Sequence, residues 1–134
     1  MEHKSQHYCL ITGSAGGIGQ ALVRGFSSAG YQVIATDIDV KPDGLNCQHY
    51  IQADLSLITN DEKYAANFLS TVRRYTGDNG LHLLINNAAI QILGGVDSLT
   101  RQDWRNTLDV NLLAPFFLTK LLPRTEYTQL VRNI

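Results

Sequence analysis

The sequence predicts an α/β fold, a doubly wound parallel sheet with strand order 3-2-1-4-5. Apolar runs of strand length alternate with segments of helical period along the chain. A Gly-rich stretch directly follows the first apolar run, and the most apolar run, LHLLINNA at 81–88, suits a central strand covered on both faces. We therefore expect one domain over 1–134, with a sheet that is incomplete at the edge formed by its fifth strand.

The expected strands are short apolar runs, which lie at 8–13, 31–37, 49–54, 81–88 and about 129–134. The first helix begins at Gly17, and Gly30 suits the residue that follows a helix end. A second helix covers 60–76, with Tyr64, Phe68, Leu69 and Val72 facing inward, and a third, long helix covers about 100–122. The candidate caps are Thr59 or Asn60 for the second helix and Ser98 or Thr100 for the third.

Composition excludes several classes of protein. With 44% hydrophobic and 17% charged residues, the chain is typical of a globular domain and not of a disordered one. The net charge of −1, without a Lys/Arg run, argues against nucleic acid or an anionic membrane as partner. No segment has the roughly 18 apolar residues of a membrane span. Cys9 and Cys47 form no CxxC pair, so we expect no metal site and the free thiols of a cytoplasmic protein.

The Gly-rich stretch ITGSAGGIG at 11–19 joins the first strand to the first helix, as in a Rossmann-type sheet. Gly13 permits a tight turn, Gly17 has no Cβ to obstruct a pyrophosphate, and Gly19 lets the helix lie close to the strand. The free N–H groups and the dipole at the helix start favour an anion there. This context favours dinucleotide binding over a turn that binds nothing.

Two acidic residues follow the next two strands. Asp37 ends the second strand, where a carboxylate can accept both hydroxyls of an adenosine ribose and repel a 2′-phosphate. No Lys or Arg occurs at 14–18 or at 38, so NAD is expected over NADP. Asp54 ends the third strand, and with Leu55 it either frames an adenine ring or caps the following loop.

These motifs resemble the short-chain dehydrogenase/reductase family. The segment TGSAGGIG, at 12–19, fits both the TGxxxGxG and the TGxxGxxG loops of that family, and NNAA at 86–89 resembles the NNAG motif of its shorter branch. The resemblance implies that Asn87 and Ala88 lie against the ribose next to nicotinamide; alternatively, Asn86 and Asn87 only tie the fourth strand to its neighbours. Ala89 replaces the family's Gly. The cofactor-binding residues expected together are Gly13, Ser14, Gly17, Ile18, Gly19, Asp37, Asp54, Leu55, Asn87, Ala88 and Ala89.

The segment LDVNLLAPFF, at 108–117, resembles the helix that carries a catalytic Asn in the family, which implies that role for Asn111. Pro115 has no N–H and cannot bond the carbonyl four residues earlier, which belongs to Asn111. That carbonyl is therefore expected to be free to hold a water, and the helix is expected to bend nearby.

The family places a catalytic Ser after its fifth strand, followed by a Tyr-x-x-x-Lys pair. No Tyr in this sequence has Lys four residues later. We therefore interpret the chain as the cofactor-binding half of an NAD-dependent alcohol or carbonyl oxidoreductase, truncated and inactive in isolation. Its partners would be a small alcohol or carbonyl substrate and further copies of itself, because the incomplete sheet predicts a homo-oligomer or self-association through 100–134.

Two other functions remain open from the residues. One is a catalytically empty NAD-binding or regulatory module. The other is a methyltransferase that uses S-adenosylmethionine, because such folds also have a Gly loop and acidic residues after the second and third strands. The TG start of the loop, the NNAA motif and the Asn111–Pro115 helix argue against the methyltransferase.

Overall fold

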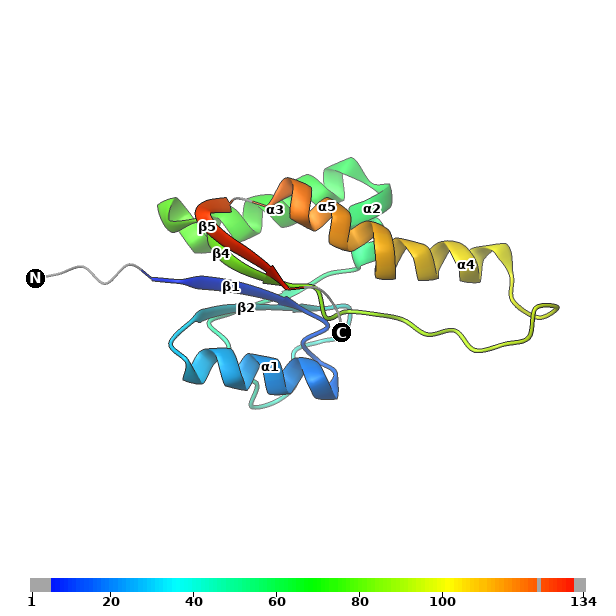
Figure 1. Cartoon of the computed structure of the whole chain (residues 1–134), viewed down its shortest axis with the longest axis horizontal. Helices are drawn as coiled ribbons and strands as arrows, with labels where there is room; N and C mark the ends of the chain where they lie inside the picture. The colour runs from blue at the N-terminus through cyan, green and yellow to red at the C-terminus, as the bar shows by residue number, and fades with distance from the viewer. Residues whose placement is uncertain (1–5, 123, 132–134) are drawn as a thin grey trace, which may run out of the picture.

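The computed structural model describes residues 6–122 and 124–131, and it contains a five-stranded sheet of order β3-β2-β1-β4-β5 (Figure 1). Every neighbouring pair of strands is parallel. The strands are β1 (Tyr8–Thr12), β2 (Gln32–Asp37), β3 (His49–Gln52), β4 (Leu81–Ile85) and β5 (Arg124–Val131). The predicted fold class and strand order are thus confirmed, with β3 and β5 at the two edges.

Helices cover both faces of the sheet, as a doubly wound fold requires. Figure 1 shows α1 (Gly17–Ser28) on one face, and α2 (Leu55–Asn60), α3 (Glu62–Thr76) and α5 (Ala114–Leu121) on the other. Alternate residues of β1 face opposite sides: Ile11 packs with Val23 of α1, whereas Leu10 packs with Phe68 of α3. All five residues of β1 are buried, which explains the continuous apolar run.

The end of α1 follows the predicted pattern. Ala29 is the C-cap, and Gly30 follows it with φ of +94°, a backbone conformation that residues with a Cβ rarely adopt. At the other end, Gly16 is the N-cap and supplies no side-chain hydrogen bond. The first N–H groups of α1 therefore have no capping side chain.

The predicted helix at 60–76 is α3 in the structure, which covers Glu62–Thr76. The sequence did not predict the short helix α2, which occupies 55–60, and α3 begins after it at Glu62. Its cap is Asp61, whose Oδ1 accepts from the N–H of Tyr64 at 3.0 Å, so the prediction of Thr59 or Asn60 as cap was wrong. Asn60 instead ends α2.

The predicted long helix at 100–122 has three parts. Thr100 caps α4 (Arg101–Leu108) in a reciprocal capping box with Asp103, as one of the two predicted caps. A π turn at Asp109–Leu113 follows and leads directly into α5. Such a turn contains one residue more than an α-helical turn, and the N–H of Ala114 bonds the carbonyl of Asp109, five residues back. The sequence did not predict this change of register.

The last strand begins earlier than predicted. β5 starts at Arg124, five residues before the expected start at 129, and its pairing with β4 is irregular between Leu81 and Leu83. The sequence did not predict a strand at 124–128, because this stretch is polar and lacks the apolar run of a buried strand. Residues 132–134 of the predicted strand lie outside the described part. Within that part, no helix is long and apolar enough to cross a membrane.

Candidate functional site

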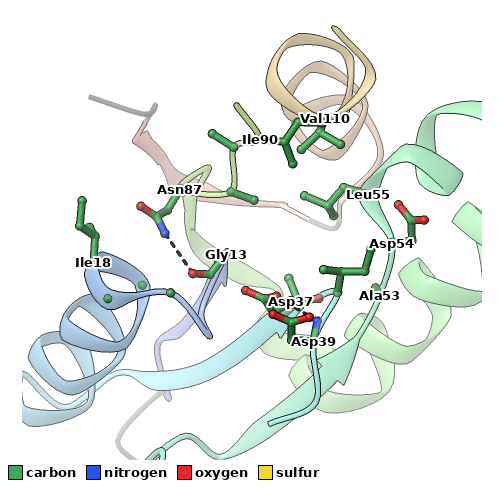
Figure 2. Close-up of a pocket in the computed structure, with 17 residues that line it drawn as sticks. Gly13, Ile18, Asp37, Asp39, Ala53, Asp54, Leu55, Asn87, Ile90 and Val110 are labelled. Carbon is green, nitrogen blue, oxygen red and sulfur yellow. Dashed lines mark hydrogen bonds between the residues drawn. The ribbon is translucent and has the colours of Figure 1, made fainter. Parts of the chain in front are cut away.

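A cavity of about 480 Å³ opens at the carboxyl ends of β1, β2, β3 and β4, where parallel sheets of this type place their ligands. In Figure 2, Gly13, Ile18 and Asn87 border one side of it, and Leu55 borders the opposite side. Its lining residues are Gly13, Gly16, Gly17, Ile18, Gly19, Thr36, Asp37, Ile38, Asp39, Ala53, Asp54, Leu55, Asn87, Ala88, Ala89, Ile90 and Val110.

The structure thus brings ten of the eleven predicted cofactor-binding residues to one cavity, and Ser14 is the exception. Ser14 is fully buried beneath the loop. Its hydroxyl donates to the carbonyl of Ile11 at 2.6 Å, and its N–H donates to the carbonyl of Thr36 at 3.1 Å. These bonds hold the loop to the ends of β1 and β2.

The three glycines of the loop have distinct surroundings. Gly13 has φ of +67°, and a Cβ there would come within 2.8 Å of the Cα of Ala88. A Cβ on Gly19 would overlap the carbonyl oxygen of Gly13. Gly17 differs, because it lines the cavity and a Cβ there would have no atom within 4 Å. Packing therefore requires glycine at 13 and 19, whereas at 17 its small size only keeps the cavity open.

Thr12 joins the loop after β4 to the glycine loop. Its Oγ1 accepts from the N–H groups of Asn87 at 3.1 Å and Ala88 at 2.9 Å. The side-chain amide of Asn87 donates to the carbonyl of Gly13 at 3.2 Å, the dashed bond at the left of Figure 2. Asn87 therefore ties the two loops together, as one of its two expected roles requires. Asn86 is buried, and its Oδ1 has no hydrogen-bond partner among the described residues.

Asp37 is held in place at the end of β2 by two backbone groups. The N–H of Ala15 donates to Oδ2 at 2.9 Å, and the N–H of Asp39 donates to Oδ1 at 3.0 Å. The carboxylate thereby links the glycine loop to the segment after β2 while it also lines the cavity. Charge-assisted hydrogen bonds of this kind fix the orientation of the carboxylate before any ligand binds.

Asp54 both caps a helix and lines the cavity. Its Oδ1 accepts from the N–H of Ser56 at 2.9 Å and from the hydroxyl of Ser56 at 2.7 Å, so the capping role is observed. Among the described residues that line the cavity, Asp37, Asp39 and Asp54 carry the charges, and none is Lys or Arg. The cavity is therefore electronegative near the ends of β2 and β3.

Asn111 lies beside the cavity and not in its lining. Its Oδ1 accepts from the N–H of Ile90, and its Nδ2 donates to the carbonyl of Ile90, both at 2.8 Å. Ile90 and the residue before Asn111, Val110, do line the cavity, and Figure 2 shows both at the same end. The amide of Asn111 thus holds the loop after β4 against the π turn.

The sequence did not single out seven of the lining residues: Gly16, Thr36, Ile38, Asp39, Ala53, Ile90 and Val110. Most adjoin residues that it did identify, so position at a strand end is the signal that would have found them. Val110 is different, because the π turn between α4 and α5 determines which residues of this segment face the cavity.

The lining suits a ligand that combines an anion, hydroxyl groups and a flat apolar part. The uncapped start of α1, without an acidic side chain in its first turn, favours an anion beside Gly17. The fixed carboxylate of Asp37 can accept hydroxyl groups, and Leu55, Ile90 and Val110 supply apolar walls. The described residues contain no group of three His, Cys, Asp or Glu arranged to hold a metal.

Comparison with known proteins agrees with this geometry. The short chain dehydrogenase family matches residues 7–128. The short chain dehydrogenase/reductase dpchG of Colletotrichum higginsianum is 35% identical over 121 residues, which cover 87% of this chain and 45% of that protein. This chain therefore spans less than half the length of that relative.

Two solved structures have the same fold. The structure of 4-hydroxyisoleucine dehydrogenase complexed with NADH has a TM-score of 0.72 at 28% identity, over 86% of this chain and 47% of that one. A short chain dehydrogenase from Burkholderia cenocepacia in complex with NADP has a TM-score of 0.78 at 27% identity, over 97% of this chain and 56% of that one. With the family match over most of its length, the chain belongs to the short chain dehydrogenase family.

Proposed function

We propose that this chain is the cofactor-binding half of an NAD-dependent oxidoreductase that interconverts alcohols and carbonyl compounds. One observation carries the proposal: the open side of Gly17 and the fixed carboxylate of Asp37 line the same cavity at the strand ends. A nicotinamide dinucleotide has the pyrophosphate and the ribose hydroxyls that these two features suit. Dinucleotides bound to related structures support the same ligand class.

The proposed orientation of the dinucleotide runs across the cavity. The pyrophosphate lies at the start of α1, against Gly17 and Ile18, and the adenosine ribose lies against Asp37. The adenine lies between the Asp54–Leu55 side and the segment after β2, and the nicotinamide ribose lies against Asn87 and Ala88. Ala89 is exposed and lines the cavity.

NAD is proposed as the preferred cofactor because of charge. A 2′-phosphate on the adenosine ribose would meet the carboxylate of Asp37, with Asp39 beside it. No Lys or Arg among the described lining residues would compensate this repulsion. The B. cenocepacia structure holds NADP, so family membership does not decide the preference, and the proposal rests on these carboxylates.

The bound nicotinamide would supply hydride transfer, and this chain would bind and orient it. Asn111 is proposed as the catalytic residue of this half, through the main-chain carbonyl that Pro115 cannot bond. The 134 residues contain no Tyr followed four residues later by Lys, the pair that would move a hydroxyl proton. The 134-residue polypeptide is therefore expected to bind NAD without turning over an alcohol.

We also propose that copies of the chain associate through α4 and the π turn. Exposed apolar side chains recur at four-residue intervals along α4, the π turn and the start of α5: Trp104, Leu108, Leu112 and Phe116 are 46–62% accessible. Exposed apolar surface of this kind is typical of interfaces.

Both cysteines are free thiols, which favours a reducing compartment, and we propose the cytoplasm.

Calorimetric titration with NAD, NADP and S-adenosylmethionine tests the proposed ligand. NAD should bind at least about tenfold more tightly than NADP, equivalent to about 1.4 kcal/mol, and S-adenosylmethionine should not bind. Tighter binding of NADP would contradict the assigned role of Asp37, and binding of S-adenosylmethionine alone would favour the methyltransferase. An assay for NADH formation tests the expected lack of turnover, and robust NADH production from a simple alcohol by this polypeptide would contradict it.

A further inference from the structure

Three consecutive residues of the π turn contact three different parts of the structure. Asp109 is bonded to the end of α2, Val110 lines the cavity, and Asn111 is bonded to Ile90 of the loop after β4. A shift of one residue in the turn would therefore move both Val110 and Asn111 away from the cavity end that they form. The contacts that hold the π turn in this register therefore determine the geometry of the cavity end beside Ile90 and Val110.

The end of α2 holds Asp109 at two points. The side-chain amide of Asn60 donates to Oδ2 of Asp109 at 2.8 Å, and the hydroxyl of Thr59 contacts the main-chain carbonyl of Asp109 at 3.3 Å. That carbonyl also receives the N–H of Ala114, the bond that defines the π turn. The contacts from α2 thus converge on the residue where the helical register changes.

Asn60 is itself anchored. The same amide group donates to the carbonyl of Ser56 at 2.8 Å, one turn earlier in α2. The other end of α2 is fixed by the Asp54 cap, and both Asp54 and Leu55 line the cavity. One short helix therefore reaches from the Asp54 side of the cavity to the π turn.

We propose that Asn60 is a positioning residue, which holds the π turn through Asp109 and thereby places Val110 and Asn111 at the cavity. It touches neither the cavity nor the proposed ligand. The inference rests on the proposed function for its ligand, because Ile90 belongs to the same loop as Asn87 and Ala88, against which the nicotinamide ribose is proposed to lie.

The test compares two ligands that share all but one part. NADH carries nicotinamide, whereas ADP-ribose has the adenosine, the pyrophosphate and the second ribose without it. Asn60→Asp replaces the donor by a carboxylate that faces the carboxylate of Asp109. We expect this variant to bind NADH about threefold to tenfold more weakly, as for loss of one such bond, while its affinity for ADP-ribose changes less than about twofold.

A second variant restores the pairing in reverse. In Asn60→Asp with Asp109→Asn, the amide is on the π turn and the carboxylate is on α2, so NADH affinity should recover toward that of the original chain. Asn67→Asp, on the exposed side of α3, adds the same charge and should change neither affinity. Equal weakening of both ligands by Asn60→Asp, no weakening, or no recovery in the double variant would overturn the proposal.

Hydrogen exchange gives a readout that needs no ligand. The N–H of Ile90 donates to Oδ1 of Asn111, so its exchange rate reports whether the π turn is in register. Asn60→Asp should accelerate exchange at Ile90, and the double variant should slow it again. Unchanged exchange would overturn the positioning role, whereas failure of the original chain to bind NADH or ADP-ribose would refute only the proposed ligand.

Discussion

Asn111 and Ile90 form a reciprocal pair of hydrogen bonds, in which the side-chain amide of Asn111 bonds both the N–H and the carbonyl of Ile90 at 2.8 Å. The amide thus imitates a neighbouring strand for one residue of the loop after β4. Because the loop has no helix or strand of its own before α4, this pair and the Thr12 bonds hold its first residues beside the cavity.

Replacement of Asn111 by Asp should destabilise the protein by about 1 kcal/mol, because a carboxylate cannot donate to the carbonyl of Ile90 and repels it. Urea unfolding measures the free energy. Asn106→Asp is the matched control, since Asn106 lies in the adjoining α4 and only needs to accept from Gln102. An equal loss in the two variants would mean that the added charge, and not the lost bond, is responsible.

Substitutions in the glycine loop should separate folding from binding. Gly17→Ala should change the unfolding free energy by no more than about 0.5 kcal/mol, because its Cβ meets no atom, yet it should weaken NAD binding by filling the cavity. Gly19→Ala should cost about 3 kcal/mol or more, because its Cβ overlaps the backbone of Gly13.

Gly25→Ala is the control for the glycine series. Gly25 lies in the exposed middle of α1, and a Cβ there meets nothing. The change should raise the unfolding free energy by up to about 1 kcal/mol through helix propensity and leave NAD affinity unaltered. Weakened NAD binding by Gly25→Ala, or none by Gly17→Ala, would argue against pyrophosphate at the start of α1.

The sequence singled out the glycine loop and Asp37, most of which line the cavity, because their signals are local. Tight turns, helix ends and strand ends leave marks within a few residues, as Gly30 and Thr100 also demonstrate. The π turn left no such mark. Pro115 indicated a disturbed helix, but the register depends on contacts between Asp109 and α2, about 50 residues away in the chain.

The cap of α3 and the orientation of Ser14 also depend on contacts that the sequence does not show. Asn60 and Asp61 are both good capping residues, and the choice of Asp61 depends on where α2 ends. Ser14 belongs to the predicted loop motif, yet its hydroxyl turns inward to Ile11 and it is buried beneath the cavity. Sequence spacing places a residue in a loop but does not decide which way its side chain points.

Asp37→Arg should reverse the cofactor preference toward NADP, because it replaces a repulsive charge at the 2′ position by an attractive one. Asp37→Asn removes the charge and keeps an acceptor oxygen for the N–H of Ala15 or Asp39, so it should narrow the preference without reversing it. Dissociation constants for NAD and NADP with each variant measure this. If Asp37→Arg still prefers NAD to NADP, another residue must determine the discrimination at the 2′ position.

Stability should fall as the pH falls below about 6.5, in part because of His82. Burial, with a smaller contribution from His7, lowers the pKa of His82 from 6.5. The ring of His82 stacks on the ring of His7, with 4.4 Å between the ring centroids, and its Nδ1 accepts a hydrogen bond from the N–H of Tyr8 at 3.2 Å. The folded state favours the neutral ring, so the unfolded state binds a proton more readily as the pH falls, and this lowers the free energy of unfolding. Well above pH 6.5, His82 is neutral in both the folded and the unfolded state, and it no longer makes stability depend on pH.

Urea unfolding at pH 7.5 and 5.5 tests this pH dependence. His82→Asn keeps an acceptor for Tyr8 and removes the titration, so its loss of stability between the two pH values should be smaller than that of the original chain. It should not vanish, because burial also lowers the pKa of His49, which stacks on Tyr75. An equal loss with and without His82 would assign the effect to other groups.

Self-association should depend on the exposed apolar side chains of α4 and the π turn. Leu108 and Leu112 are 46% and 62% accessible, so their replacement by Glu removes no packing from the core of the monomer but introduces charge into the proposed interface. Sedimentation velocity over a range of concentrations should reveal an associating original chain and a monomeric Leu108→Glu, Leu112→Glu variant. Val96→Glu is the control, because Val96 is 95% accessible in the loop before α4 and lies outside this surface. A monomeric original chain, or association that persists in the double variant, would exclude this surface as the interface.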